Sequence, residues 1–390
     1  MQSAIPSVSG TTIFEHMSRL CQQIGAINLG QGFPDLPEPP ELIAAAQTAL
    51  ANRSNQYPPM RGLPELRRAI ATYYAQTHGL TLDEDEILVT SGATEALASA
   101  ILALVAPGDE VICIQPLYDA YLPLIRRAGG VPQLVSLTPP DWQLSMAAFE
   151  AAITPRTRLV VLNTPNNPTG TLLPRATLEA IGALCDRHDL LLLCDEVWEG
   201  LVFEGEHCPV LAIPSLRQRA VKVGSAGKIF SLTGWKIGWA AASAPLVQRL
   251  AERHQFLTFT TATPLQWAVT EGLTLPPEWH AGQRARYRAA RTRLVDNLTA
   301  AGYAVLPAAG TWFVTIDLAA SGLPPRDSAI AEALALQGGV GSIPVSAFYA
   351  EAPDTGYLRL CYCKRDDTLG EAITRLAAFR EKILSGAITL

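Results

Sequence analysis

Short apolar runs alternate with longer stretches of helical spacing over most of the chain, and this alternation constrains the fold most. Turn residues bound each run, which is typical of buried parallel strands joined by crossover helices. The expected strands are residues 87–90, 110–114, 159–162, 190–194 and 220–223, and the clearest helical stretches are residues 94–105, 117–128 and 174–188. The pattern predicts an α/β fold with a doubly wound, mostly parallel sheet between about residues 45 and 270.

The pattern changes after Pro276. A long Arg-rich helix is expected over residues 279–300, and shorter elements follow it. These are strands near residues 310–318, 342–345 and 357–362 and helices from Asp327 and Asp367. We therefore expect a large domain of residues 46–275 and a smaller α+β domain of residues 276–390, with residues 1–45 forming an N-terminal arm that joins the small domain.

Charge and hydropathy limit the partners. The chain has 36 acidic and 30 basic residues, a net charge of −6, and no run of Lys or Arg. This balance disfavours nucleic acid and anionic membrane surfaces, so small molecules are the expected partners. The longest apolar helical stretch, residues 96–106, is shorter than the ~18 residues that cross a bilayer. The opening MQSAIPSVSG has no basic segment before an apolar one, so we expect a cytoplasmic protein.

The cysteines and histidines show no metal-binding spacing. Seven cysteines are scattered, mostly in apolar runs, which favours reduced core thiols over a disulfide framework. Cys361 and Cys363 alternate along an expected strand, and two thiols alone do not complete a zinc site. The sequence therefore predicts no metal.

Two glycine motifs look like nucleotide-binding loops but lack essential positions. The segment GQGFPD of residues 30–35 starts like a dinucleotide fingerprint, yet Asp35 replaces the third glycine and Pro34 blocks the turn. Before Gly227 and Lys228, Lys222 stands where a phosphate loop needs its first glycine. A Rossmann dehydrogenase and a P-loop nucleotide hydrolase are both disfavoured.

Four polar segments follow expected strands, at the sheet edge where open α/β folds bind ligands. The turn Ser91-Gly92-Ala93-Thr94 runs straight into a helix, so free N–H groups and the helix dipole suit a phosphate. The other three segments supply the amide of Asn167, the carboxylate of Asp195 and the amine of Lys228. Singly, each has a structural explanation, such as a capping Asp or a solvated Lys. Together they describe a site for pyridoxal 5′-phosphate (PLP).

Seven strings carry a resemblance to a known family. They are, in order, NLGQGFPD, NQYPPMRG, SGATEAL, NTPNNPTG, CDEVWEG, SAGKIFSLTGWKIGW and YLRLCYCK. The chain resembles the PLP-dependent class I/II aminotransferases of fold type I over nearly its whole length. Within them it is most similar to the methionine, kynurenine and glutamine aminotransferases.

The resemblance implies the cofactor contacts. Lys228 would hold PLP covalently and then move a proton on the substrate, and Asp195 would keep the pyridine nitrogen protonated. Asn167 would donate to the phenolic oxygen and lie close to the substrate carboxylate, and Tyr118 would stack on the ring. The phosphate would be held by the backbone of Gly92, Ala93 and Thr94 together with Ser225 and Lys236.

The resemblance also implies the substrate contacts and a homodimer. Arg359 would grip the α-carboxylate through a bidentate fork. Gly32 would let the substrate approach the backbone. Apolar walls would come from Ile13, Phe14 and Phe259, with Phe348 as a further candidate. Tyr57 would reach the phosphate in the neighbouring subunit.

Two positions depart from the family pattern. Trp198 stands where the family usually has Tyr, whose phenol donates to the cofactor oxygen, whereas an indole N–H donates with a different reach. Thr260 stands where some kynurenine enzymes have His.

The predicted function is transfer of an amino group from an aromatic or sulfur-containing amino acid, of methionine, phenylalanine, kynurenine or glutamine type, to a 2-oxo acid. A carbon–sulfur β-lyase of cysteine-conjugate or cystathionine type on the same scaffold is the alternative within enzymes. A non-catalytic regulatory module that has kept the cofactor scaffold is the alternative outside them.

Overall fold

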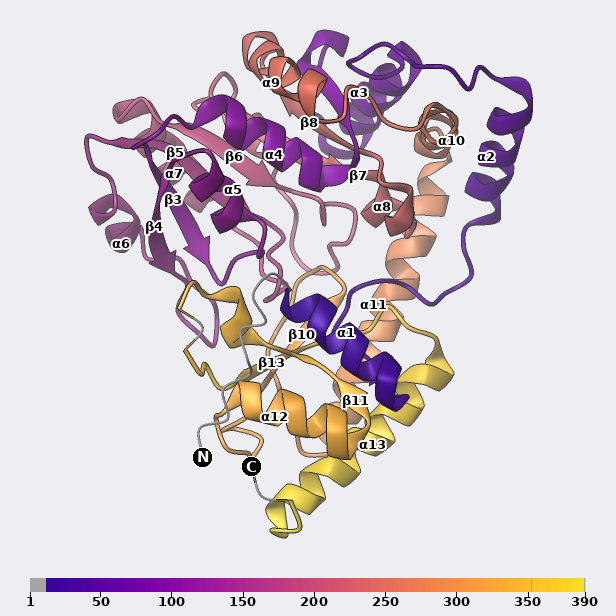
Figure 1. The fold of residues 1–390 in the computed structure, drawn as a ribbon, viewed down its shortest axis with the longest axis vertical. Helices are drawn as coiled ribbons and strands as arrows, with labels where there is room; N and C mark the ends of the chain where they lie inside the picture. The colour runs from indigo at the N-terminus through magenta and orange to yellow at the C-terminus, as the bar shows by residue number, and fades with distance from the viewer. Residues whose placement is uncertain (1–11, 352, 389) are drawn as a thin grey trace.

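The computed structural model describes residues 12–351, 353–388 and 390. Residues 1–11 of the predicted N-terminal arm lie outside this range. Figure 1 shows a large sheet wrapped by helices in the upper half of the molecule. The lower half holds a smaller sheet region with α1 (Ile13–Ile24), α12 (Asp327–Ala333) and α13 (Asp366–Leu384), and the long helix α11 (Pro277–Ala300) runs between the halves (Figure 1).

The large sheet has seven strands in the order β2-β8-β7-β6-β5-β3-β4. Their bounds are β2 (Ile87–Thr90), β3 (Glu110–Gln115), β4 (Val131–Ser136), β5 (Thr157–Asn163), β6 (Leu191–Asp195), β7 (Ala220–Ser225) and β8 (Gly238–Ala242). Only β8 runs antiparallel to its neighbours. The predicted α/β fold with a mostly parallel sheet is confirmed, and every expected strand of this part is present.

The sequence pattern missed β4 and β8. Strand β8 reads GWAAA, and Gly and Ala are weak strand formers. Strand β4 is an edge strand that is mostly exposed or half-buried, so it lacks an apolar run. Tertiary pairing rather than local propensity therefore determines both strands.

Alternate residues of the strands point into two cores, one on each face of the sheet. One core contains Val161, Leu193 and Val223 and is closed by α4 (Gly92–Leu104), α5 (Tyr121–Arg127) and α9 (Ala244–Leu257). The other contains Val160 and Leu192 and is closed by α3 (Pro64–His78) and α7 (Arg175–Arg187), among others. Burial on both faces explains why these strands read as unbroken apolar runs.

The smaller region contains a four-stranded antiparallel sheet in the order β12-β13-β10-β9. These strands are β9 (Ala304–Val305), β10 (Phe313–Asp317), β12 (Ile343–Pro344) and β13 (Tyr357–Cys361). Strand β1 (Ile27–Asn28), near the start of the chain, pairs in parallel with β11 (Val340–Gly341). The domain boundaries at residues 45 and 275 stay a prediction.

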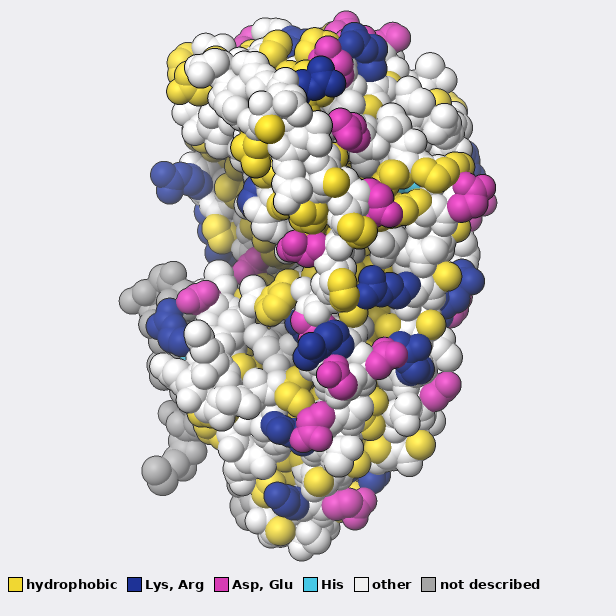
Figure 2. Space-filling model, turned by 90° about the vertical axis from the view of Figure 1, so that its right-hand side faces the viewer, with side chains coloured by type: hydrophobic (Ala, Val, Ile, Leu, Met, Phe, Trp, Pro, Cys, Tyr) yellow, Lys and Arg dark blue, Asp and Glu magenta, His cyan; other side chains and the backbone are white. Residues whose placement is uncertain are grey.

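The remaining helical elements are short or peripheral. They comprise α2 (Pro40–Asn52), α6 (Met146–Ala151), α8 (Ala226–Ile229), α10 (Thr263–Leu273), a π-helical turn η4 (Leu334–Gly338) and the 3₁₀ turns η1 (Glu84–Glu86), η2 (Val210–Ala212), η3 (Thr233–Trp235) and η5 (Val345–Phe348). On the face shown in Figure 2, basic and acidic side chains are interspersed with hydrophobic ones. Among the described residues, no helix combines the length and apolar character needed to span a membrane.

Candidate active site

The carboxyl ends of β5, β6 and β7 place the predicted polar residues at one edge of the large sheet. Asn163 ends β5 and lies opposite Asp195, which ends β6, and Asp195 lies opposite Val223 of β7. Strand β7 then runs into the short helix α8, which carries Lys228. The edge therefore presents an amide, a carboxylate and an amine side by side.

The start of α4 forms an anion cradle beside them. Gly92 opens the helix directly after β2 with a positive φ of 77°, which favours glycine. A Cβ there would lie 3.1 Å from Lys236 Nζ, and a Cβ on Gly238 would lie 2.6 Å from the backbone N of Ala93. Glycine at both positions thus lets a lysine and a neighbouring strand approach the free N–H groups of the helix.

These elements enclose an inner cavity of about 230 Å³. Ten residues predicted to contact the cofactor line it, namely Gly92, Ala93, Thr94, Tyr118, Asn167, Asp195, Trp198, Ser225, Lys228 and Lys236. Six further lining residues were not predicted, namely Leu97, Asn163, Val197, Gly227, Thr233 and Ile237. Residues that lie far apart in the sequence thus meet around one space.

Lys228 faces aromatic rings instead of a carboxylate. Its Nζ lies 4.6 Å from the ring centroid of Trp198 and 4.9 Å from that of Trp312. Burial lowers the pKa of Lys228 to about 8, although Asp195 acts in the opposite direction. An amine with such a pKa is partly deprotonated near neutral pH and can act as a nucleophile or base.

Asp195 is held by two donors at the back of the cavity. The hydroxyl of Tyr121 donates to Oδ2 at 2.8 Å, and the backbone N–H of Val197 donates to Oδ1 at 3.2 Å. The side chain is only 5% exposed. Burial raises the pKa of Asp195, and the two hydrogen bonds oppose that rise.

Asn163 connects Asp195 to Asn167. Its Nδ2 donates to the backbone carbonyl of Asp195 at 2.8 Å, and its Oδ1 accepts from the backbone N–H of Asn167 at 2.8 Å. The side chain of Asn167 in turn accepts a hydrogen bond from Arg359 Nη1 at 2.7 Å. These hydrogen bonds therefore tie the backbone of Asp195 to Asn167, and Asn167 to the guanidinium of Arg359.

Arg359 lies in β13, is 1% exposed and is surrounded by rings. Its guanidinium carbon lies 3.9 Å from the ring centroid of Phe313, 5.0 Å from that of Phe348 and 5.2 Å from that of Phe14. Nη2 donates to the carbonyl of Gly30, whereas the buried Nε has no partner among the described residues. Burial lowers the pKa of Arg359 to about 9. A buried guanidinium without a carboxylate partner suits an anionic ligand.

An outer cavity of about 480 Å³ adjoins the inner one and reaches Arg359. The two cavities share Tyr118, Asn167, Trp198 and Lys228, and Phe14 and Gly32 line only the outer one. A Cβ on Gly32 would lie 2.5 Å from the Phe313 ring, so that ring alone requires glycine at this position. Asp119 also lines the outer cavity, and burial raises the pKa of its carboxyl group while Arg359 lowers it.

The other predicted pocket residues lie outside these two cavities. Ile13 and Phe348 pack with Phe14 in a small cluster next to the outer cavity. Phe259 is 41% exposed and contacts the ring of Tyr57, with 5.6 Å between their centroids. In this chain, neither Tyr57 nor Phe259 lines the inner or the outer cavity.

Three of the unpredicted residues at the site lie close in sequence to predicted ones. Asp119 and Tyr121 follow Tyr118, and Asn163 precedes Asn167 by four residues. Tyr118 lies before α5, which begins at Tyr121, so helical spacing could not have linked these two residues. No local signal indicates that Asn163 bridges two strands, because its partners come from distant segments.

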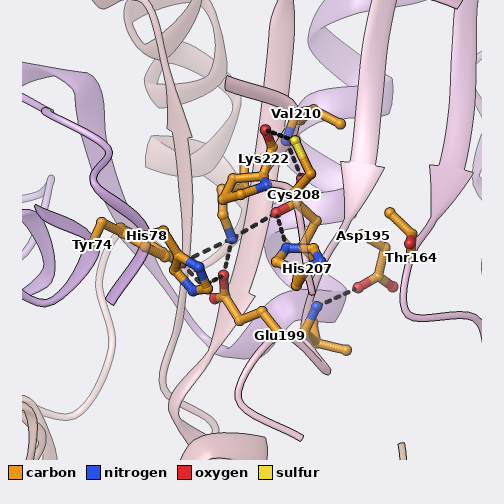
Figure 3. Close-up of polar contacts among 12 residues, drawn as sticks. Tyr74, His78, Thr164, Asp195, Glu199, His207, Cys208, Val210 and Lys222 are labelled. Atoms are coloured by element: carbon orange, nitrogen blue, oxygen red, sulfur yellow. Dashed lines mark hydrogen bonds and ion pairs between the residues drawn. The ribbon is translucent and has the colours of Figure 1, made fainter. Parts of the chain in front are cut away.

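A second polar cluster lies behind Asp195, on the other face of the sheet (Figure 3). Lys222 of β7 contacts Glu199 and lies 3.1 Å from Glu196 Oε2, and His207 Nε2 lies 2.8 Å from that same carboxylate. The ligand atoms of Glu196, Glu199 and His207 all lie within 4.8 Å of one another, as in a metal site. The Lys222 ammonium supplies the positive charge between these carboxylates.

The α/β PLP-dependent transferases have a largely parallel sheet. Its carboxyl edge carries an amine, a buried carboxylate and an anion cradle, as it does here. The chemistry of this donor set fits PLP, which has a reactive aldehyde, a basic ring nitrogen and a phosphate. Lys228, Asp195 and the start of α4 match these three groups in turn.

Comparison with known proteins identifies the family. The family model "Aminotransferase class I and II" matches residues 24–376. The methionine aminotransferase of Escherichia coli is 42% identical over 377 residues, covering 96% of this chain and 97% of that protein. Kynurenine–oxoglutarate transaminase 1 of Mus musculus is 34% identical, covering 93% of this chain and 94% of that protein. The solved structure of N-succinyldiaminopimelate aminotransferase from Mycobacterium tuberculosis has a TM-score of 0.92 and 42% identity, covering 95% of this chain and 97% of that one.

The chain therefore belongs to the class I and II aminotransferases, as predicted, and is a PLP-dependent enzyme of fold type I. Its substrates are amino acids and 2-oxo acids. The alternative of a non-catalytic regulatory module has no support, because the relatives that match nearly the whole chain are aminotransferases.

Proposed function

We propose that the inner cavity holds PLP and that Lys228 is the residue covalently joined to it. Bound PLP supplies an aldehyde that takes up the amino group and a ring that accepts electrons from the substrate. Once a substrate amine had displaced it from the cofactor, the free amine of Lys228, with its pKa lowered to about 8, would carry the proton from the substrate Cα to the neighbouring cofactor carbon. Asp195 would keep the proton on the ring nitrogen.

The remaining residues of the inner cavity orient the cofactor. Tyr118 would stack on the ring, and Asn167 and Trp198, which line both cavities, would lie on the side that leads to Arg359. The phosphate would be held by the N–H groups that open α4, with Ser225 and Lys236. Each of these contacts uses a residue that lines the same space, which supports a single bound orientation.

We infer that the amino donor has an aromatic or sulfur-containing side chain, of methionine, phenylalanine, kynurenine or glutamine type. The observation that carries this inference is the make-up of the outer cavity. Among the described residues that line it, Lys228 and Arg359 are the only cations, whereas Phe14, Phe313 and Trp198 supply aromatic surface. Asp119 adds a negative charge, which disfavours a second carboxylate on the donor side chain.

The relatives support the same substrate class. The Escherichia coli relative is a methionine aminotransferase and the mouse relative a kynurenine transaminase. The solved structure at 42% identity is an N-succinyldiaminopimelate aminotransferase, so an acidic donor belongs in any substrate panel.

A substrate panel tests this proposal. We expect kcat/KM for methionine, phenylalanine, kynurenine and glutamine to exceed that for aspartate and N-succinyldiaminopimelate by roughly tenfold or more, since desolvating an unpaired carboxylate beside apolar surface is costly. Higher kcat/KM for the acidic donors would contradict the proposal.

Pyruvate and ammonia released from cystine without any 2-oxo acid would instead indicate the β-lyase alternative, which no structural observation favours.

We further propose a homodimer in which Tyr57 reaches the partner's phosphate site. Tyr57 is 82% exposed and packs edge-on against Phe259, and Phe256 nearby in sequence is 84% exposed. Large exposed rings grouped in this way are typical of an interface. Analytical ultracentrifugation should give twice the mass of the chain, 41.8 kDa, and a monomer that retains full activity would contradict this proposal.

A further inference from the structure

We propose that Tyr121 is a positioning residue that keeps Asp195 ionised and aimed at the cofactor ring, and so sets the electron-accepting strength of bound PLP. The inference rests on the proposed function, because it takes Asp195 as the partner of the ring nitrogen. It assigns to Tyr121 a part in the reaction that its burial alone does not explain.

The geometry separates Tyr121 from an ordinary core residue. Its side chain is 2% exposed, and its hydroxyl donates to Asp195 Oδ2 at 2.8 Å. Asp195 Oδ1 accepts only the longer bond from the backbone of Val197, at 3.2 Å. Tyr121 is therefore the one side chain among the described residues that donates to this carboxylate. Its ring also packs edge-on against Tyr118, with 5.7 Å between the centroids.

The hydrogen bond from Tyr121 affects whether a proton lies on Asp195 or on the ring nitrogen of bound PLP. Burial raises the pKa of Asp195, which favours the neutral acid, and the hydroxyl of Tyr121 is the strongest influence in the opposite direction. An ionised Asp195 keeps the ring nitrogen protonated and positively charged. Without the hydroxyl, the carboxylate becomes more basic and draws the proton away from the ring, which weakens the ring as an electron acceptor.

The titratable groups that face this pair are few. Those acting on Asp195 or Tyr121 are Lys228, Glu196, Cys194 and Tyr118. Tyr121→Phe removes only an oxygen atom and leaves all four in place. A change in the titration of bound PLP in this variant therefore reports the lost hydrogen bond.

The experiment is a spectrophotometric pH titration of the PLP-loaded wild type and of the Tyr121→Phe variant. Because a less positive ring makes the PLP–Lys228 linkage less acidic, we expect the midpoint to rise by roughly half to one pH unit. We also expect kcat to fall about tenfold while KM for the amino donor stays within about twofold, since Arg359 is untouched.

Tyr303→Phe is the matched control. Tyr303 is also buried, at 4% exposed, and its hydroxyl donates to the carbonyl of Leu376 at 2.8 Å, in the small region. It should lose similar stability and keep the wild-type midpoint. An unchanged midpoint in Tyr121→Phe, or an equal shift in Tyr303→Phe, would overturn the inference. A wild-type protein that takes up no PLP would overturn the proposed function instead.

Discussion

Two buried lysines on one stretch of chain occupy opposite electrostatic environments. Lys222 lies within β7 and touches the carboxylates of Glu196 and Glu199, whereas Lys228 lies six residues later against the rings of Trp198 and Trp312. Burial lowers the pKa of both amines. At Lys222 the two carboxylates outweigh burial and hold the pKa well above its usual value, but at Lys228 burial prevails and the pKa falls to about 8.

The difference shows how one fold makes a structural cation and a reactive amine from the same residue type. Paired carboxylates fix the charge of Lys222, and that charge in turn helps to lower the pKa of Glu196 to about 2 against the effect of burial. Among the described residues, no carboxylate forms an ion pair with Lys228, and burial lowers its pKa despite the opposite effect of Asp195. The reactivity of Lys228 therefore depends on burial outweighing the opposite effect of the nearby Asp195 carboxylate.

The largest expected effect is on activity. Lys228→Ala removes both the covalent attachment and the proton carrier, so kcat should fall by about 10⁴-fold or more. Stopped-flow or long-time product assays measure the residual rate. Lys382→Ala, at an exposed lysine near the end of α13, is the control and should keep wild-type activity. A Lys228→Ala enzyme within tenfold of wild type would contradict the assignment.

Next in size is the effect of removing the paired lysine. Lys222→Met leaves Glu196 and Glu199 buried without their cation, which should cost about 3–5 kcal/mol of folding free energy. Chemical denaturation of the purified protein measures this loss. The double variant Lys222→Met, Glu199→Gln should recover part of it, and a double variant less stable than the single one would argue against the pairing.

The third effect concerns substrate binding. Arg359→Lys keeps a positive charge but loses the planar fork and its bond to Asn167, so kcat/KM should fall by about 10- to 100-fold, or 1.4–2.7 kcal/mol. The fall should be similar for every amino donor, because all share the α-carboxylate. A loss confined to one donor would place Arg359 in side-chain recognition instead.

The smallest expected effect is on folding stability. Removing Lys228 should stabilise the PLP-free protein, whereas removing Lys222 should destabilise it. In the PLP-free protein at pH 7, Lys228 is a buried cation without a carboxylate partner, so Lys228→Met should increase stability, on the order of 1 kcal/mol. In the wild type, the pKa of Lys228 is lower in the folded than in the unfolded chain. The folded form therefore binds fewer protons between pH 8 and 10.5. Wild-type stability therefore rises across this window, and the advantage of Lys228→Met should shrink. Denaturation curves at pH 7 and pH 10 check both statements, and a destabilised variant at pH 7 would contradict them.

The sequence predicted the sheet and the lining of the inner cavity well, because both follow from local signals. Buried parallel strands read as apolar runs. Asp195 stands directly after one such run, and Asn167 and Lys228 each stand five residues after the runs that end at residues 162 and 223. Strand β8 was missed because GWAAA has little strand propensity, and its place is determined by pairing with β2 and β7.

Interactions between distant segments could not be predicted from the sequence. The bond of Tyr121 to Asp195 spans 74 positions, and that of Arg359 to Asn167 spans 192. The packing of Lys228 against Trp312 and the pairing of Lys222 with Glu199 likewise depend on the folded sheet. The sequence singled out Lys228 through its place after a strand and the family resemblance, but it did not show that Lys222 is paired with two carboxylates.

Borohydride reduction of the PLP-loaded protein, followed by peptide mass spectrometry, separates the two lysines most directly. The different surroundings of the two lysines predict a pyridoxyl group on Lys228 and none on Lys222. A label on Lys222, or no label on Lys228, would contradict it.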